Sequence, residues 1–441
     1  MNARGIALYN VTEILEEKKP LHIVLKESLD GIEDEKERAF TARLTRGCVE
    51  RVLTLDSILN RISKVKTEKM KPAIRNILRI SLYQILFMDA APDFAVCNEA
   101  VKLTAKRGLS ALKGFVNGVL RNICRRKEEF LSEIYSEGTN MSFRFSVPEW
   151  IKEEYIQEFG KQKTYSIFCY YLKDNPVSVR FNTSVDPAFA KWEKEQGIEK
   201  NPYLNYCGYL KGAGAVEKLE GFKNGSFTVQ DLSSVLAGFV ADSAWKSQGG
   251  SGKSVLDLCA APGGKSLHMA DMGYEVVSCD ISERKTALID EAAKRCGFKN
   301  ISVMVNDALV YNPEFEKSFD VVICDLPCSG LGIIGKKPDI KYNMTPEKSL
   351  ELAVLQKDIL KNAVRYIKDG GVLVYSTCTL RKCENTENAE YIKKELGLTG
   401  IPVKEHLPKE IVPKGEEDCY IQILPGEYGS DGFFISCFKK A

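Results

Sequence analysis

The sequence predicts an all-α domain followed by a parallel, doubly wound α/β domain, and two changes of pattern along the chain indicate this. Up to about residue 130, apolar residues recur at helical spacing. From residue 254 onward, short β-rich runs alternate with helical or turn segments, as a parallel sheet requires. We therefore expect a helical domain at 1–130, a mixed α/β region at 140–240 and the doubly wound domain at 241–441.

Two stretches of the first region carry the helical signal most clearly. In 110–123 the apolar residues are three and four positions apart, and Lys113 and Arg121 fall on the opposite side. In 71–88 the same spacing follows Pro72, a residue that is favoured at helix starts. No strand-like alternation interrupts this region, so we expect it to be helical throughout.

The middle region mixes the two kinds of signal. Residues 177–183 (VSVRFNT) are typical of a strand, whereas 146–159 (SVPEWIKEEYIQEF) predicts a capped helix. The glycine- and serine-rich stretch 243–254 predicts a boundary loop.

The third region contains five β-rich runs, at 254–260, 274–281, 301–307, 319–326 and 371–379. Two further runs near the end, 419–425 and 432–440, are joined only by Gly426 to Gly432. So short a link excludes a helical crossover and predicts an antiparallel hairpin. An α/β sheet that ends in an antiparallel strand is similar to class I methyltransferases rather than to nicotinamide dehydrogenases.

The distribution of charge is more informative than its total. The formal net charge is only +2, but the stretch 102–127 contains eight basic residues and no acidic one. A solvated helical face is the ordinary interpretation of a charge run. An acid-free stretch of this length favours contact with a polyanion.

The fourteen cysteines indicate neither a disulfide framework nor a metal site. No CxxC pair occurs, and the three histidines are far apart. The N-terminus has no apolar h-region of the kind that a signal peptide needs, and no 18-residue apolar run occurs. We expect a cytoplasmic, reducing environment, no membrane, no metal, and a monomer.

The motif LDLCAAPGGKS, at 256–266, follows the first of these strands and opens a helix. Its small residues let a ligand approach the backbone closely. The second strand ends in Asp280, where a carboxylate can accept both hydroxyls of a ribose, and the next two end in Asp307 and Asp325. The alternative is that surface acids end these strands by chance.

Acidic residues at the carboxyl ends of the strands, without a GxGxxG motif, do not suit the pyrophosphate of a dinucleotide. It suits S-adenosylmethionine, which carries a ribose, an adenine and a cationic sulfonium but no phosphate. A P-loop is excluded because the GKS at 264–266 lacks the required GxxxxGK spacing. We therefore predict S-adenosylmethionine as the cofactor.

Two cysteines in polar turns suggest covalent chemistry at the same edge. Cys328 follows the fourth strand and Cys378 lies near the end of the fifth, although a lone cysteine here would more often be a core residue. The C5 atom of a pyrimidine is a poor nucleophile until a thiolate adds at C6. One thiol would add and the second would assist release, while Asp325 could bond N3 and the 4-amino group of cytosine.

The motifs LDLCAAPGGK, DLPCSGLG, KKPDIKY and YSTCTL, the last followed by ENTENAEYI, together resemble the Sun-type RNA (cytosine-5) methyltransferases. The stretch 95–123 resembles the helical RNA-binding domain of the antitermination factor NusB. The combination is similar to bacterial methyltransferases of 16S ribosomal RNA. It implies a C-terminal Rossmann-like class I methyltransferase domain, preceded by an all-α NusB-like domain and a small mixed α/β region.

The resemblance also implies roles for particular residues. It makes Cys378 the nucleophile and Cys328 the thiol that resolves the adduct, with Asp325 and Lys265 in the same catalytic set. The implied cofactor contacts are Cys259, Ala260, Ala261, Pro262, Gly263, Gly264, Lys265, Asp280, Asp307 and Asp325. The implied partner is 16S ribosomal RNA, naked or in early assembly.

One departure from the family pattern is visible: Lys336 and Lys337 stand where relatives often carry an arginine pair. The charge is kept, but lysine cannot form the planar bidentate interaction that arginine offers to phosphate.

Three alternatives stay open. A non-catalytic RNA-binding factor would be free to lose Cys328 and Cys378, and both are present. A DNA cytosine methyltransferase would use the Pro-Cys thiol as nucleophile and need no Thr-Cys partner. A transfer-RNA methyltransferase shares the catalytic motifs, so only the N-terminal domain favours ribosomal RNA.

Overall fold

The computed structural model describes residues 2–89, 91–184, 197–212, 216–412 and 419–441. The chain forms two compact units. The helical unit comprises Met1–Lys173 and Ile334–Met344, and the sheet unit comprises Asp174–Ile333 and Thr345–Ala441. The domain boundaries expected from the sequence stay a prediction. The compact units do not coincide with those domains, because helices beyond residue 140 and the short segment Ile334–Met344 pack with the N-terminal helices.

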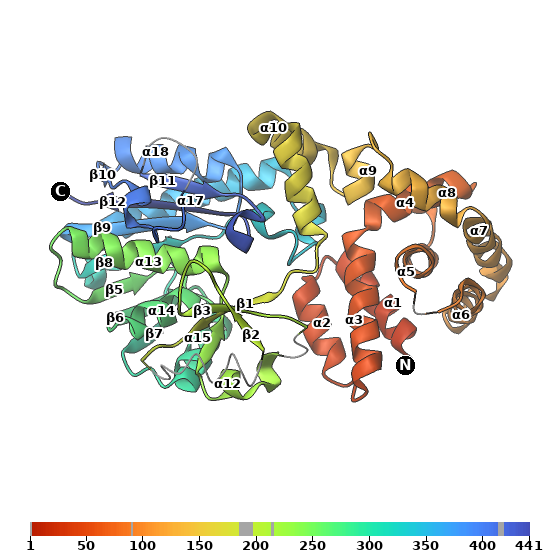
Figure 1. Ribbon diagram of the computed structural model, residues 1–441, viewed down its shortest axis with the longest axis horizontal. Coiled ribbons are helices and arrows are strands. Elements are labelled where there is room, and N and C mark those ends of the chain that lie inside the picture. The colour runs from red at the N-terminus through yellow and green to blue at the C-terminus, as the bar shows by residue number, and fades with distance from the viewer. Residues whose placement is uncertain (1, 90, 185–196, 213–215, 413–418) are drawn as a thin grey trace. The chain divides into compact units, whose positions relative to one another are not determined.

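The helical unit is built around one buried helix, α5 (Pro72–Phe87), which packs against α1, α3, α6 and α7. Its apolar side chains are almost fully buried, and Pro72 occupies the first turn as predicted. The helices that complete the unit are α1 (Ala3–Leu15), α2 (Leu21–Leu29), α3 (Glu35–Glu50), α4 (Val52–Ile62), α6 (Asp93–Lys106), α7 (Lys113–Arg125), α8 (Lys127–Tyr135), α9 (Met141–Phe145) and α10 (Glu149–Tyr171). The prediction of an all-helical N-terminal region is confirmed (Figure 1).

The predicted helix at 146–159 forms, but the expected cap at its start does not. Helix α10 begins after Pro148, which offers no side-chain cap. Ser146 instead adopts a left-handed conformation, and its hydroxyl accepts a hydrogen bond from the Leu53 amide at 2.9 Å. The serine therefore satisfies a free amide at the start of α4, a distant contact that local sequence does not reveal.

Residues 334–344, which contain the KKPDIKY motif, pack within the helical unit. The Lys341 ammonium donates to the Glu50 carbonyl at 2.8 Å, and the Tyr342 hydroxyl donates to the same oxygen at 3.1 Å. This carbonyl ends α3, where a cation is favoured by the helix dipole. Lys336 is exposed and Lys337 is half-buried.

The sheet unit begins with a small antiparallel sheet in the order β2-β3-β1-β4. Its strands are β1 (Val177–Phe181), β2 (Ile198–Lys200), β3 (Cys207–Leu210) and β4 (Phe227–Val229). The strand predicted at 177–183 is thereby confirmed. The end of β1 is tied to helix α14 (Gly264–Asp271) of the larger sheet, because Asp271 accepts hydrogen bonds from the Thr183 and Ser184 amides, at 3.0 and 2.9 Å.

The larger sheet has eight strands in the order β10-β12-β9-β8-β5-β6-β7, with β11 paired to β12. The run from β9 to β7 is parallel, and β12 is antiparallel to β9, β10 and β11. The strands are β5 (Ser254–Asp257), β6 (Glu275–Asp280), β7 (Ile301–Val305), β8 (Phe319–Asp325), β9 (Ile367–Thr377), β10 (Thr399–Gly400), β11 (Tyr420–Ile423) and β12 (Phe433–Lys439). The five predicted parallel strands and the predicted hairpin are confirmed.

Helices cover both faces of this sheet, so alternate residues of the strands enter two separate cores. Val321 and Ile323 of β8 pack in the core that includes α13 (Leu232–Ser247), whereas Val322 and Cys324 pack in the core with α17 (Pro346–Tyr366) and α18 (Thr386–Lys394). Figure 1 shows α13 on one side of the sheet and α17 with α18 on the other. The strand order reverses between β5 and β8, the place where open α/β sheets bind their ligands.

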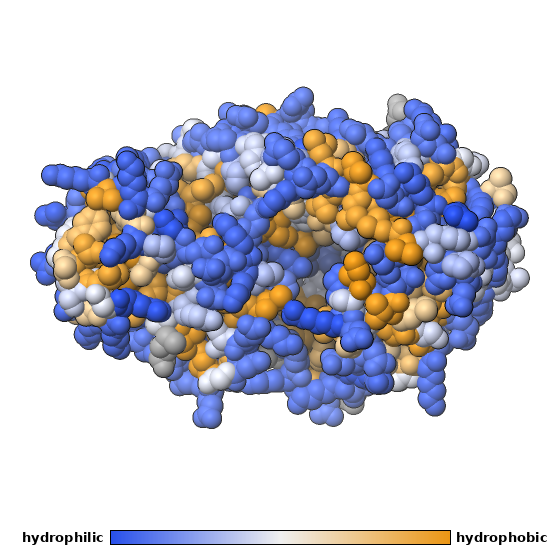
Figure 2. Space-filling model, turned by 180° about the vertical axis from the view of Figure 1, so that it is seen from behind, coloured by the Kyte–Doolittle hydropathy of each residue, from blue (hydrophilic) through white to orange (hydrophobic). Residues whose placement is uncertain are grey.

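Among the described residues, no helix is both long and apolar enough to cross a membrane. On the face in Figure 2, hydrophilic side chains predominate and apolar ones lie in smaller separate areas.

Candidate active site

The loop between β5 and α14 (Gly264–Asp271) forms the floor of the predicted cofactor site. Gly263 has a φ of 104°, which favours glycine, and a side chain there would come within 3.2 Å of Ile289. The loop is tied to β6 because the Ala260 amide donates to the Cys279 carbonyl at 2.9 Å. Pro262 and Cys259 belong to the same short loop, so the predicted motif forms a single structural element.

Asp257, at the end of β5, is fully buried below this loop. The Ser266 hydroxyl donates to one of its oxygens at 2.7 Å, and the other oxygen has no protein donor among the described residues. Burial raises the pKa of Asp257 to about 6. An incompletely bonded buried carboxyl next to a glycine-rich loop is a polar group that a ligand or water could satisfy.

Asp280 lies at the end of the neighbouring strand, β6, and its carboxylate already accepts most of the hydrogen bonds that it can. It accepts hydrogen bonds from the Ala261 amide at 3.0 Å and the Ile281 amide at 2.8 Å, and Lys285 lies 2.9 Å away. A carboxylate has about four acceptor positions. One therefore remains for a ribose hydroxyl, and a second becomes available if the half-exposed Lys285 side chain moves aside.

Exposed apolar side chains next to these acids are site features that the sequence analysis missed. Ile281 is 58% exposed after β6, and Leu309 is 45% exposed after β7. The two loops are adjacent because the Asn306 amide donates to the Asp280 carbonyl at 3.0 Å, while Asp307 accepts from the Leu309 amide. Flat, apolar surface beside a ribose-binding acid suits an adenine ring. An apolar residue one or two positions after a strand-ending acid was the available signal.

Lys265 and Asp325 form an ion pair at the point where the strand order reverses. The Lys265 ammonium donates to Asp325 at 2.5 Å and to the Ser234 hydroxyl at 3.0 Å, and it lies 5.2 Å from the centroid of the Phe433 ring. The Ser376 hydroxyl donates to the second Asp325 oxygen at 2.9 Å. The lysine is buried, whereas the carboxylate is about one-third exposed, so part of Asp325 is accessible to a ligand.

The two predicted catalytic thiols lie together. Strands β8 and β9 pair in register as far as Asp325 and Ser376, and the loops that follow bring Cys328 and Cys378 to a sulfur–sulfur distance of 3.3 Å. The hydrogen bond to Cys378, followed by burial, raises the pKa of the Cys328 thiol well above its ordinary value. Both effects favour the protonated form of the Cys328 thiol.

Glu384 is a second feature that the sequence analysis did not single out, although it begins the quoted segment ENTENAEYI. Its fully buried carboxylate accepts a hydrogen bond from the Ser329 amide at 2.8 Å, directly beside Cys328. The local sequence could not indicate this contact, because the two residues are 55 positions apart.

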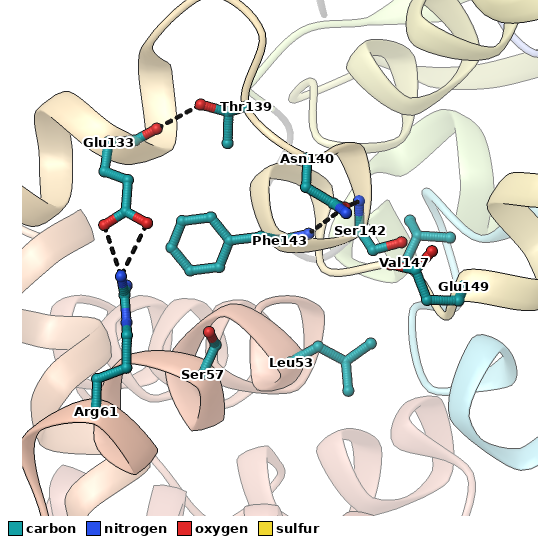
Figure 3. A pocket seen from close by; sticks show the side chains of 10 residues that line it. All are labelled: Leu53, Ser57, Arg61, Glu133, Thr139, Asn140, Ser142, Phe143, Val147 and Glu149. Atoms are coloured by element: carbon teal, nitrogen blue, oxygen red, sulfur yellow. Dashed lines mark hydrogen bonds and ion pairs between the residues drawn. The ribbon is translucent and has the colours of Figure 1, made fainter.

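A separate pocket of about 550 Å³ lies in the helical unit (Figure 3). Arg61 and Glu133, which face each other across its edge in the figure, form an ion pair at 2.8 Å. The lining also includes Phe143, Asn140 and Glu149 but no cysteine. This pocket therefore offers none of the groups that the thiol chemistry requires.

Comparisons with known proteins agree with this architecture. A family model described as 16S rRNA methyltransferase RsmB/F matches residues 248–439, and one described as the NusB family matches residues 1–125. The fold and the site thus define a Rossmann-like methyltransferase with a NusB-like helical domain. A protein of Bacillus subtilis (strain 168), "Probable ribosomal RNA small subunit methyltransferase B", is 33% identical over 100% of this chain and 99% of its own length. The chain belongs to the RsmB/F family.

Other relatives extend the comparison. "Ribosomal RNA small subunit methyltransferase B" of Escherichia fergusonii is 30% identical, covering 100% of this chain and 99% of that protein. The solved structure of PH0851 matches 100% of this chain and 99% of its own at a TM-score of 0.79 and 23% identity. NSun6 from Pyrococcus horikoshii with SFG matches 66% of this chain and 98% of its own at a TM-score of 0.56 and 21% identity. The two structures support the fold.

Proposed function

We propose that this protein methylates C5 of a cytosine in 16S ribosomal RNA, with S-adenosylmethionine as methyl donor and a covalent adduct at Cys378. The observation that carries the proposal is the pair of thiols, 3.3 Å apart, beside the Lys265–Asp325 ion pair. The names of the relatives, which are ribosomal RNA small subunit methyltransferases, support the choice of RNA. We place the reaction in the cytoplasm and propose that a monomer performs it.

The residues at the carboxyl ends of the parallel strands fit S-adenosylmethionine. Asp280 would accept hydrogen bonds from the ribose, and Ile281 and Leu309 would cover the adenine. Gly263 would let the donor approach the backbone closely, and the carboxylates of Asp280 and Asp325 favour a cationic ligand over a phosphate. S-adenosylmethionine supplies an electrophilic methyl group on a positively charged sulfur.

Cys378 would act first, as the nucleophile. Its thiolate forms a bond to C6 of the cytosine, the C5–C6 double bond opens, and electron density moves to C5. C5 then takes the methyl group as the bond between that methyl and its sulfur breaks. A base removes the C5 proton, the C5–C6 double bond returns, and the bond between Cys378 and C6 breaks.

Cys328 would assist the last step. Its protonated thiol lies 3.3 Å from the Cys378 sulfur and donates a hydrogen bond as negative charge returns to that sulfur. A donor in this place stabilises the leaving thiolate without competing with it for C6, because Cys328 keeps its own proton.

Asp325 and Lys265 would distinguish cytosine from uracil. An ion-paired Asp325 carboxylate accepts a hydrogen bond from the 4-amino group of cytosine. Uracil carries a carbonyl oxygen at the same position, which a carboxylate repels. Lys265 holds the carboxylate in place through its 2.5 Å contact.

The helical unit would hold the RNA backbone. Lys106, Arg107, Arg121 and Arg125 are exposed on α6 and α7 or directly after α6. Exposed lysine and arginine side chains bind phosphates and release counterions. This is the interpretation that the NusB-like domain and the acid-free stretch support together.

The direct test is to incubate the protein with labelled S-adenosylmethionine and either 16S transcript or unmodified transfer RNA, and to map 5-methylcytosine by bisulfite sequencing. The proposal expects one modified cytosine in the 16S transcript. Modification confined to transfer RNA would favour the rival substrate, and RNA binding without any methylation would favour a non-catalytic factor.

A further inference from the structure

Two adjacent residues in the segment after Cys378 contact the loops that carry both thiols. The first, Glu384, is a fully buried carboxylate that accepts three hydrogen bonds. They come from the Ser349 hydroxyl at 2.5 Å, the Ser329 amide at 2.8 Å and the Gln356 amide nitrogen at 3.2 Å. A buried carboxylate is costly unless it is well bonded, so this network fixes the loop of Cys328 strongly.

The second, Asn385, is 1% exposed, and its side chain forms hydrogen bonds with the residues on both sides of Cys378. Its side-chain oxygen accepts a hydrogen bond from the Thr377 hydroxyl at 2.5 Å, and its amide nitrogen donates to the Thr379 carbonyl at 3.0 Å. The residues on both sides of the proposed nucleophile are therefore held by one side chain.

Further contacts connect the two loops to each other and to α17. The Gln356 amide nitrogen also donates to the Pro327 carbonyl at 2.8 Å, and the Gln356 oxygen accepts from the Tyr375 hydroxyl at 3.1 Å. The hydroxyls of Ser329 and Thr379 lie 2.6 Å apart and join the two loops directly. A displacement of either Glu384 or Asn385 would thus move one thiol relative to the other.

We propose that Glu384 and Asn385 are positioning residues that set the separation of the two thiols, Glu384 through the loop of Cys328 and Asn385 through the loop of Cys378. This inference rests on the proposed function of the thiols. Neither side chain needs to touch the RNA or the methyl donor, because each acts through backbone and hydroxyl groups next to a cysteine.

The charge of Glu384 adds a second effect. The titratable and charged groups that act on the Cys328 thiol are Cys378, Glu384, Asp325 and Tyr375. After the hydrogen bond to Cys378 and burial, the negative charges of Glu384 and Asp325 help to raise the pKa of Cys328. Glu384 therefore places the Cys328 loop and also favours the protonated thiol that adduct release requires.

The test uses Glu384→Gln and Asn385→Ala in the full chain, with Glu387→Gln as the matched control. Glu387 is an exposed acid on the same segment. We expect Glu384→Gln and Asn385→Ala to lower kcat about 10- to 100-fold, since small displacements of reacting groups have effects of this size. The KM for RNA and the affinity for S-adenosylmethionine should stay at the wild-type value, as should all parameters of the control.

A pH profile separates positioning from general support of the fold. In a Cys378→Ala background, the rate of Cys328 alkylation by iodoacetamide is measured against pH with Glu384 and with Glu384→Gln. We expect the midpoint to fall by about one pH unit when the charge is removed. An unchanged midpoint together with an unchanged kcat would overturn the role of Glu384.

Each outcome bears on one of the two proposals. If Glu384→Gln loses S-adenosylmethionine binding and so has not folded, Asn385→Ala decides, and wild-type kcat in that variant overturns the inference. If the wild-type protein itself methylates no cytosine, the proposed function fails. If it methylates cytosine and both variants do so at the wild-type rate, only the positioning role fails.

Discussion

Each unit of the molecule contains a close pair of cysteines, and the two pairs differ in what surrounds them. In the helical unit, Cys97 of α6 and Cys124 of α7 lie 3.8 Å apart, sulfur to sulfur. In the sheet unit, Cys328 and Cys378 lie 3.3 Å apart. Closeness of thiols alone therefore does not identify a catalytic site.

The surroundings make the distinction. Cys97 belongs to the apolar core of the helical unit, and burial is the main cause that raises the pKa of both helical thiols, to about 12 for Cys124. Cys328 and Cys378 instead stand in loops at the ends of parallel strands, and a buried carboxylate and an amide hold those loops. Cysteine loops that polar side chains hold by hydrogen bonds at a strand end indicate a reactive site, whereas an apolar environment indicates that the cysteines serve packing.

The largest difference between the pairs should appear when one thiol of each is removed. We expect Cys378→Ala to abolish methyl transfer because no nucleophile remains to add at C6. Cys124→Ala removes a half-buried core thiol and should keep near wild-type activity with a modest loss of stability. Labelled methyl incorporation into RNA measures both variants, and an active Cys378→Ala variant would remove the distinction.

A second prediction concerns the cofactor side of the site. We expect Asp280→Ala to weaken S-adenosylmethionine binding by roughly 1.5–3 kcal/mol, the usual worth of hydrogen bonds to a charged group. The loop amides of Ala261 and Ile281 also lose their acceptor, so part of the weakening comes from loop disorder. Titration calorimetry on the variant checks this, and an unchanged affinity would exclude Asp280 from the site.

The comparison extends from thiols to buried lysines. Burial lowers the pKa of Lys341 in the helical unit to about 7, below the value near 10.5 of a free lysine. Between these values the unfolded chain holds a proton that the folded chain lacks. The free energy of unfolding should therefore rise with pH above 7, by at most about 1.4 kcal/mol per pH unit.

Lys341→Met should remove this part of the pH dependence. Denaturant unfolding of both proteins at pH 7 and pH 9 gives the difference, which isolates Lys341 from the other groups that titrate in this range. Equal pH dependence in the two proteins would show that the lysine stays charged at the end of α3.

The smallest expected effect concerns the exposed basic surface. Removing residues 1–130 would cut through the helical unit, which continues to Lys173, so substitutions are the better test. We expect Arg121→Gln with Arg125→Gln to lower the slope of log K for RNA against log salt by roughly 0.7–0.9 for each phosphate that the variant no longer neutralises. Fluorescence titration at several salt concentrations measures this, and Lys317→Gln, on the sheet unit, provides the control.

The sequence allowed the fold and the reacting groups to be predicted where the signal is local. Strand runs, the link at Gly426 to Gly432 and the turn contexts of Cys328 and Cys378 are all contained in short stretches. Glu384, Ser146 and Lys341 could not be interpreted in this way. Each acts on residues that are distant in sequence, and the packing that brings them together has no local pattern.

The central claim is that the two thiols of the sheet unit play unequal parts in a covalent mechanism, and one measurement tests it directly. Wild-type protein, Cys378→Ala and Cys328→Ala are incubated with 16S transcript and S-adenosylmethionine and then run on a denaturing gel. We expect a denaturation-resistant protein–RNA adduct to accumulate with Cys328→Ala, because release is impaired, and to be absent with Cys378→Ala. The reverse pattern would make Cys328 the nucleophile, and full activity without any adduct in both variants would contradict covalent catalysis.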